Sequence, residues 1–335
     1  MKPFEKNEGS DMRKVHLTLF GVSLFYGIMF SLAGEIMPTY LSPEGFVWLR
    51  IAFAACCFHL ISFFLPKEKA DWSAHKWDFL LCAFFGTSGN MYLFFKGLEL
   101  THPINGAVLM LITPLAVAIL DHIRIKQRMR VKFIVGLLLA CQGSFLLMSY
   151  SAAGFHFDSS TVAGDIFVAV NALFYAFYLV RVKNLTAHYS ANTINRITFG
   201  LGFLYMTLYC LIIWYLTTMS ITTPGARSAF SIAFLGPESH DIPAAIWGKI
   251  AYTLVFVSFL VYLMNTYAVK KAGPTLAGIY IYLQPVLAAV IAVGLGRDEM
   301  DLVKGLSIAC VLLGVWFAKE NSPSVLSNRV SSRNN

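Results

Sequence analysis

Ten long runs of apolar residues limit what this chain can fold into. Each run approaches the ~20 residues that an α-helix needs to cross a hydrocarbon core of roughly 30 Å. Composition agrees, because 57% of the 335 residues are hydrophobic and only 13% are charged, whereas a soluble domain has about 25% charged residues. The chain is therefore predicted to be an all-α integral membrane protein with ten transmembrane helices. The runs cover about residues 15–34, 46–65, 77–97, 104–121, 131–150, 162–180, 193–217, 249–269, 275–295 and 302–318.

The basic residues lie mostly on one side of this predicted membrane. Of the 26 Lys and Arg, 20 fall in segments that are cytoplasmic if the N-terminus is, and five of them crowd into the loop DHIRIKQRMRVK at residues 121–132. This asymmetry is the positive-inside pattern, so both termini are predicted to be cytoplasmic. The net charge of +8 then reports topology, and no nucleic-acid partner is expected. The basic residues left on the outer side are Arg50, Lys96, Arg227, Lys249, Arg297 and Lys304.

The second half of the sequence repeats the first in hydropathy. A shift of 171 residues aligns the halves without a gap to their ends, and it matches two prolines and a late glycine. Five helices per half is an odd number, so the second copy is predicted to enter the membrane inverted, an arrangement common in transporters. The mixed-charge loop GRDEMDLVK agrees, since its counterpart is the basic loop at 121–132. The matched pairs are Pro103 with Pro274, Pro114 with Pro285, and Gly143 with Gly314.

These features divide the chain into segments. The run after Lys14 is followed by no small-residue cleavage site, so it is expected to be a retained helix and not a signal peptide. The link rich in Ser, Pro and Gly inside the second half reads as an external loop. The predicted segments are 1–14, a cytoplasmic N-terminal segment; 15–150, the first five-helix repeat; 162–318, the inverted second repeat with its external loop at 218–248; and 319–335, a polar, disordered cytoplasmic tail.

Several of these residues together carry a family resemblance. Five plus five helices, Tyr26-Gly27 in the first helix, a proline in the fourth and ninth, and GRDEMDLVKGLSIACVLLGVWFA at 296–318 resemble the drug/metabolite transporter superfamily, in its ten-helix EamA-like family. The family usually has Trp-Gly where this chain has Tyr26-Gly27. The resemblance covers roughly residues 15–318 and implies a solute carrier of the plasma membrane, a secondary transporter or facilitative carrier. Such a carrier would export amino acids or related metabolites by alternating access through a central cavity between the repeats. The short loops favour a bacterial inner membrane.

Polar side chains at membrane depth indicate where such a cavity would lie, because these groups are costly when they face lipid. Helical spacing places Asn171 and Tyr175 on one face of their helix, and Tyr262 and Asn265 on one face of theirs. Aromatic rings with neutral amides suit a zwitterionic or amphipathic small-molecule solute. The alternative is that the amides join helices and the tyrosines, Tyr178 above all, anchor them at the interface. The predicted substrate-binding residues are Tyr26, Thr87, Asn90, Thr113, Asn171, Tyr175, Tyr262, Asn265, Tyr280 and Gln284.

Pro114 and Pro285 stand near the centres of matching runs. Proline removes a backbone donor and clashes with the preceding turn, which leaves a carbonyl unpaired. Each proline is predicted to act as a helix break or hinge that opens carbonyls toward a midplane cavity. The alternative is a kink for packing alone, with Thr113 and Gln284 satisfying the freed carbonyls.

Missing residue types narrow the function further. All 18 carboxylates lie outside the runs or near their ends, with Glu35 expected to pair with Arg50. A proton-coupled multidrug exporter usually needs a buried carboxylate and is therefore only an alternative, as is a lipid flippase or scramblase. No HExxH, P-loop or nucleophile elbow is present, so neither an enzyme nor a cofactor is expected. The six cysteines lack CxxC spacing and are expected to pack in the runs, with no metal site. Membrane lipid and a small solute are the expected partners, and a monomer suffices.

Overall fold

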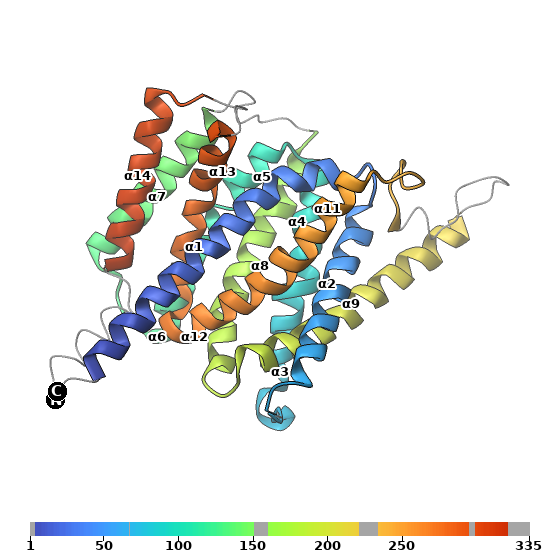
Figure 1. The fold of residues 1–335 in the computed structure, drawn as a ribbon, viewed down its shortest axis with the longest axis horizontal. Coiled ribbons are helices and arrows are strands. Elements are labelled where there is room, and N and C mark those ends of the chain that lie inside the picture. The colour runs from blue at the N-terminus through green and yellow to red at the C-terminus, as the bar shows by residue number, and fades with distance from the viewer. Residues whose placement is uncertain (1–3, 67, 151–159, 221–233, 295–298, 321–335) are drawn as a thin grey trace.

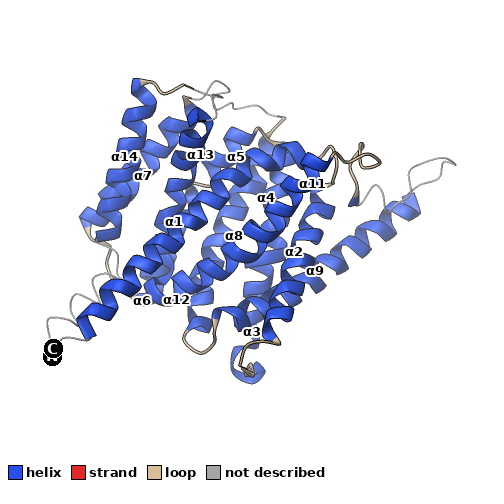
Figure 2. Ribbon diagram, in the orientation of Figure 1, coloured by secondary structure: helices blue, strands red, loops and turns tan. Residues whose placement is uncertain are grey.

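The computed structural model describes residues 4–66, 68–150, 160–220, 234–294 and 299–320. Helices form almost all of it (Figure 2), and the β pairing within these residues is an isolated bridge between Leu41 and Leu235. The helices are α1 (Phe4–Ile36), α2 (Pro43–Ser62), α3 (Trp72–Ala83), α4 (Gly89–Leu100), α5 (Pro103–Leu109), α6 (Ile112–Ile125), α7 (Val131–Ser149), α8 (Val162–Thr186), α9 (Ala191–Ser220), α11 (Ala244–Tyr252), α12 (Val261–Ile279), α13 (Leu283–Gly294) and α14 (Leu302–Glu320).

Eight helical stretches among the described residues are long and apolar enough to cross a membrane. One of them, Ala244–Gly294, is 51 residues long and contains two of the predicted runs. The run predicted at 77–97 is divided between α3, a π-helical turn at Phe84–Ser88 and α4, each too short to be counted by itself. The structure therefore has the helical, membrane-spanning character expected, while the number ten and the orientation of the termini stay predictions.

The helices pack around α8, which crosses the middle of the molecule (Figure 1). α8 contacts α4, α6 and α12, and α1 contacts α12 and α13. At one edge α7 and α14 lie side by side, and elsewhere α2 packs along α9 (Figure 1). Helices from the first and second halves of the chain therefore interleave, and they do not form two separate bundles.

Glycines allow α7 and α14 to approach closely. A Cβ atom added to Gly143 would lie 2.8 Å from the carbonyl oxygen of Ser307, and one added to Gly136 would lie 2.5 Å from the backbone nitrogen of Ala318. A Cβ at Gly314 would overlap the backbone of Ala140. Small residues at such a contact let two membrane helices pack backbone to backbone.

Both central prolines sit just after a break in a helix. α5 ends at Leu109 and α6 begins at Ile112, with Pro114 as its third residue. Likewise, a single 3₁₀ turn at Tyr280–Tyr282 separates α12 from α13, whose third residue is Pro285. The missing N–H and the bulk of each ring interrupt the preceding turn. A further kink lies inside α12 at Gly273, directly before Pro274. Gly273 has a φ of 83°, a conformation that glycine adopts without a steric penalty.

Side chains satisfy the carbonyls near these breaks. The hydroxyl of Tyr282 donates to the carbonyl of Leu111 (3.5 Å), while Ser144 donates to the carbonyl of Tyr282 (3.3 Å) and Ser23 to that of Tyr280 (2.7 Å). Thr113 does not satisfy a carbonyl at the break before Pro114, because its hydroxyl donates to the carbonyl of Ala172 in α8 (3.4 Å). The two breaks thus contact each other through Tyr282 and Leu111.

The predicted external loop is described only in part. Residues 221–233 of the 218–248 segment and the tail 321–335 lie outside the described residues. The part that is described folds back on the turn after α1, where the backbone N–H groups of Gly236 and Glu238 donate to the carbonyls of Tyr40 and Thr39, each at 2.9 Å.

Candidate functional site

A cavity lies among α1, α2, α4, α8, α12 and α13. Its walls mix aromatic rings, thioethers, neutral amides and one guanidinium group. A mostly apolar cavity with a few polar groups is the usual character of a small-molecule site. The lining residues are Tyr26, Met29, Ala33, Arg50, Asn90, Met91, Phe94, Phe95, Met110, Asn171, Tyr175, Tyr262, Ile281 and Gln284.

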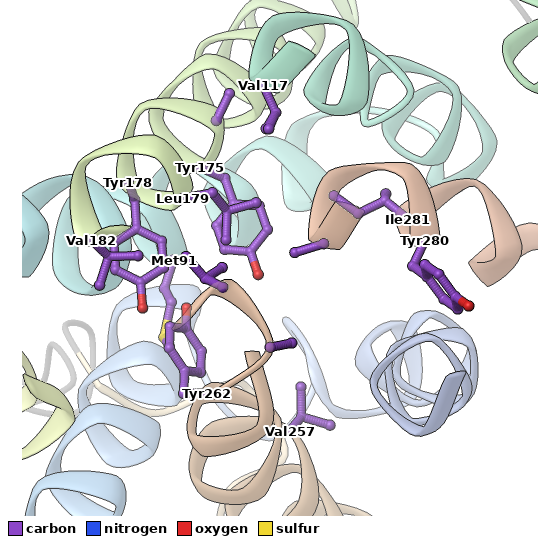
Figure 3. Packing of buried hydrophobic residues seen from close by; sticks show 14 of the residues in the cluster. Met91, Val117, Tyr175, Tyr178, Leu179, Val182, Val257, Tyr262, Tyr280 and Ile281 are labelled. Carbon is purple, nitrogen blue, oxygen red and sulfur yellow. The ribbon is translucent and has the colours of Figure 1, made fainter. Parts of the chain in front are cut away.

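Tyrosines from two helices close one side of this cavity. Tyr175 and Tyr178 project from α8 toward Tyr262 of α12 (Figure 3), with ring centroids 5.9 Å apart for the first pair and 6.3 Å for Tyr178 and Tyr262. The hydroxyl of Tyr262 donates to the carbonyl of Gly86 at 2.8 Å, and the amide nitrogen of Asn265 donates to the hydroxyl of Tyr175 at 2.8 Å. Tyr178 is 1% exposed and is therefore a core residue, so its expected role as an interface anchor is wrong.

Two asparagines join α4 to α8 at the cavity wall. The side-chain nitrogen of Asn171 donates to the carbonyl of Asn90 at 2.7 Å, and that of Asn90 reaches back to the carbonyl of Asn171 at 3.4 Å. The first bond fixes which way the Asn171 amide is turned. Its oxygen Oδ1 is buried and accepts no hydrogen bond from the described residues. A buried acceptor without a partner is costly unless something supplies a donor, so this oxygen is an unsatisfied acceptor at the cavity wall.

Six of the ten residues predicted from the sequence to bind substrate line the cavity, namely Tyr26, Asn90, Asn171, Tyr175, Tyr262 and Gln284. The other four lie elsewhere. Asn265 donates to the hydroxyl of Tyr175 and does not line the cavity itself. The hydroxyl of Thr113 donates to a carbonyl of α8, and that of Thr87 donates to the carbonyl of Ala83. Tyr280 lies apart from the other tyrosines, against α1 (Figure 3), where its hydroxyl is 2.8 Å from Nδ1 of His16.

The two prolines do not line the cavity, but their breaks border it. Met110 lies in the break before Pro114, while Ile281 and Gln284 lie at the break before Pro285. This placement leaves the hinge role of the prolines a prediction.

Arg50 is a cavity residue that the sequence reasoning assigned to the outer surface. It lies in α2, seven residues after Pro43 and therefore about 10 Å along the helix axis, and it is 3% exposed. Its Nε donates to the hydroxyl of Ser258 at 2.8 Å, and its guanidinium carbon lies 4.8 Å from the ring centroid of Phe95 and 5.6 Å from that of Phe46. The expected pair with Glu35 is wrong, because Glu35 pairs with Lys249.

The charge of Arg50 has no counter-charge among the described residues, since no carboxylate lies within ion-pair distance of it. Taking a charge out of water costs several kcal/mol, whereas a desolvated cation–π contact returns about 2 kcal/mol. The sequence did carry a signal for this site, because Arg50 is the only basic residue within the run 46–65 apart from His59, and an ionisable residue inside an apolar run is a candidate functional residue.

A layer of polar contacts lies at the end of the molecule predicted to face the cytoplasm. Asp78 of α3 forms an ion pair with Arg181 of α8, and the hydroxyl of Tyr189 accepts from the backbone N–H of Asp71 at 2.9 Å. Lys183 donates to the carbonyl of Lys270 at 2.8 Å. These contacts tie α3 and α12 to α8, and α8 and α12 also bear the tyrosines of the cavity.

Among the described residues, no group of three or more His, Cys, Asp or Glu side chains could hold a metal ion. The six cysteines are free thiols. The lining groups can bind a solute by hydrogen bonds, ring contacts and one positive charge.

Comparison with known proteins points to one family. A family model described as "EamA-like transporter family" matches residues 13–149 and again residues 162–319. The "Uncharacterized transporter YyaM" of Bacillus subtilis is 25% identical over 305 residues, covering 91% of this chain and 93% of that protein. "Uncharacterized transporter YetK" of the same organism is 22% identical, covering 90% and 83%. An "Uncharacterized transporter" of Archaeoglobus fulgidus is 23% identical over 68% of this chain and 70% of its own.

Among solved protein structures that share the fold, the following is one example. It superposes with a TM-score of 0.68 at 16% sequence identity and covers 94% of this chain and 97% of its own.

Proposed function

Because the chain belongs to the EamA-like transporter family and is a multi-pass membrane protein, we propose that it carries amino acids or related small metabolites across the membrane through its central cavity. Export across the plasma membrane, in a bacterium the inner membrane, is the proposed direction. The observation that carries the proposal is the cavity itself, where Asn90, Asn171 and Gln284 present neutral amides between the rings of Tyr26, Tyr175 and Tyr262.

Alternating access between two inverted five-helix halves is the proposed mechanism. Support comes from contacts between positions that the shift of 171 residues relates. Tyr282 contacts Leu111. Where α7 meets α14, Gly143 packs on Val311 and Gly314 packs on Ala140, and these two contacts exchange under the same shift. An axis that exchanges the two halves would produce contacts of this kind. Such an exchange lets the halves trade shapes, so that the cavity opens to one side and then to the other.

The charges of the cavity favour a carrier over the two alternatives named from the sequence. None of the 14 described lining residues is a carboxylate, and a carboxylate is what a proton-coupled exporter of cationic drugs would use. No described feature favours lipid transport. Facilitated diffusion, or coupling through groups outside the cavity, fits this lining better.

The test is solute counterflow into proteoliposomes that contain the purified protein. Labelled amino acids are screened one at a time, with and without a pH gradient. We expect saturable counterflow of at least one amino acid that the gradient leaves unchanged. Accumulation that follows the gradient would contradict the facilitative mechanism, and no counterflow of any amino acid would contradict the proposed solute class.

A further inference from the structure

We propose that Arg50 binds a negatively charged group of the transported solute, and that the solute must therefore carry a carboxylate or similar anion. This inference rests on the proposed function and names the charge that the cavity selects. The guanidinium of Arg50 lines the cavity from α2, and Arg50 is only 3% exposed.

The contacts of Arg50 hold the group in place without neutralising it. Ser258 accepts from Nε, and the rings of Phe46 and Phe95 flank the guanidinium. No hydrogen bond to a described residue occupies the two terminal nitrogens. These nitrogens form the planar fork that binds a carboxylate through two parallel hydrogen bonds. The protein thus orients the fork and leaves its binding edge to the cavity.

The predicted repeat offers a comparison for the place that Arg50 occupies beside Ser258. Ser258 lies in the π-helical turn Thr253–Leu260, and 171 residues earlier Thr87 lies in the π-helical turn Phe84–Ser88. The residue that faces Thr87 from α9 is Gly202, so close that a Cβ there would overlap the threonine hydroxyl. Where one half of the chain packs a glycine, the other places Arg50.

A second group in the cavity complements this charge. Oδ1 of Asn171 is a buried acceptor without a donor among the described residues, and the faces of Tyr26, Tyr175 and Tyr262 share the same cavity. An acceptor and aromatic rings suit an ammonium group. A donor for an anion and an acceptor for a cation in one cavity fit a zwitterion, with its carboxylate at Arg50 and its ammonium toward Asn171.

The test compares matched solutes and matched variants. The amino acid that exchanges fastest in counterflow is competed with its own carboxamide, which keeps the ammonium and loses the negative charge. The variants are Arg50→Gln, which keeps a hydrogen-bonding group without the charge, Arg50→Lys, and the control Lys96→Gln. Lys96 pairs with Glu44 and Glu99 and does not line the cavity. Its substitution therefore removes a positive charge from the same end of the molecule without changing the cavity wall.

We expect the wild type to prefer the carboxylate over the carboxamide at least ten-fold, and Arg50→Gln to lose that preference together with at least ten-fold of its counterflow. Arg50→Lys should keep part of both, and Lys96→Gln should keep all. The melting temperature of Arg50→Gln should equal or exceed that of the wild type, because a buried charge without a partner has been removed.

Three outcomes would overturn the assignment. Equal exchange of the two solutes by the wild type would overturn it and would leave the carrier function intact. Exchange that depends on chloride, and not on the carboxylate of the solute, would overturn it in the same way. A lower melting temperature of Arg50→Gln with an unchanged preference would make Arg50 a structural residue. The absence of any counterflow in the wild type would instead contradict the proposed function, and with it this inference.

Discussion

Gln284 lines the cavity with an amide that makes no hydrogen bond to the described residues. Thr113 also lies near a helix break, but its hydroxyl is turned to the carbonyl of Ala172 and away from the cavity. The two side chains were predicted from the sequence to serve the same site, and the structure separates them. A comparison of the two therefore tests whether lining the cavity, and not merely lying near it, decides the function of a residue.

We expect Gln284→Ala to lower counterflow about ten-fold, which corresponds to the loss of one hydrogen bond to solute at about 1 kcal/mol or slightly more. Thr113→Val keeps the shape of the side chain and removes its hydrogen bond to Ala172, so it should leave counterflow within about two-fold of the wild type. Both are measured in proteoliposomes at equal protein content. Equal losses in the two variants, or none in Gln284→Ala, would remove Gln284 from the site.

Arg50 shows what a single sequence does not reveal at this scale. Sorting basic residues by side of the membrane places it outside, because it lies near the start of its run, but that sorting says nothing of whether a side chain turns inward. The neutral residues Asn171, Tyr175 and Tyr262 could be predicted, because membrane depth and helical spacing place them on inward faces. Which partner each finds depends on the packing of helices distant in the sequence.

At the scale of helices, irregular turns explain which predicted residues miss the cavity. Tyr280 and Gln284 are four residues apart and would share a face of a regular α-helix. The 3₁₀ turn Tyr280–Tyr282 has three residues per turn, so Tyr280 rotates toward α1. A π-helical turn containing Thr87 separates it from Asn90 in the same way. The prolines predict that the helices break, because the missing N–H and the ring act on the adjacent turn whatever surrounds it. The length and type of each irregular turn are set by neighbouring helices.

The contact of α7 with α14 provides the test at this scale. Gly314 lies against the backbone of α7, whereas a Cβ at Gly305 of the same helix would meet nothing within 4 Å. We expect Gly314→Leu to destabilise the protein by about 1–3 kcal/mol or more through overpacking, seen as a lower melting temperature in detergent. Gly305→Leu should leave the melting temperature unchanged. A similar fall in both variants would show that leucine disturbs α14 for some reason other than this contact.

For the whole molecule, several helix contacts recur when the two halves of the chain are exchanged. In the ten-run numbering of the sequence, α4, α6 and α8 belong to the third, fourth and sixth runs, and their counterparts five runs along are α12, α13 and α1. α4 and α6 pack on α8, and correspondingly α12 and α13 pack on α1. The pairs α2 with α9 and α7 with α14 each exchange into themselves. Hydropathy and prolines in the sequence predict the repeat, but they do not predict the interleaving of the halves, because it arises from contacts between distant parts of the chain.

The inverted arrangement predicts the side on which each loop lies. A tag inserted after Arg130, between α6 and α7, should be cytoplasmic, and one inserted at Ser239, before α11, should be external. Protease access in intact cells and in inverted membrane vesicles reads both positions. Both tags on the same face would contradict the inverted repeat.

The central claim is that solute passes through the cavity, and blocking the cavity tests it most directly. In a cysteine-free variant, Ala33→Cys places one thiol on the cavity wall, and Met300→Cys places one at an exposed position, 50% accessible. Counterflow of the amino acid that exchanges fastest is measured before and after each is modified with a bulky thiol reagent. We predict that modification at position 33 abolishes counterflow, that excess solute slows this modification, and that modification at position 300 has no effect. Full counterflow after complete modification at position 33 would contradict the account.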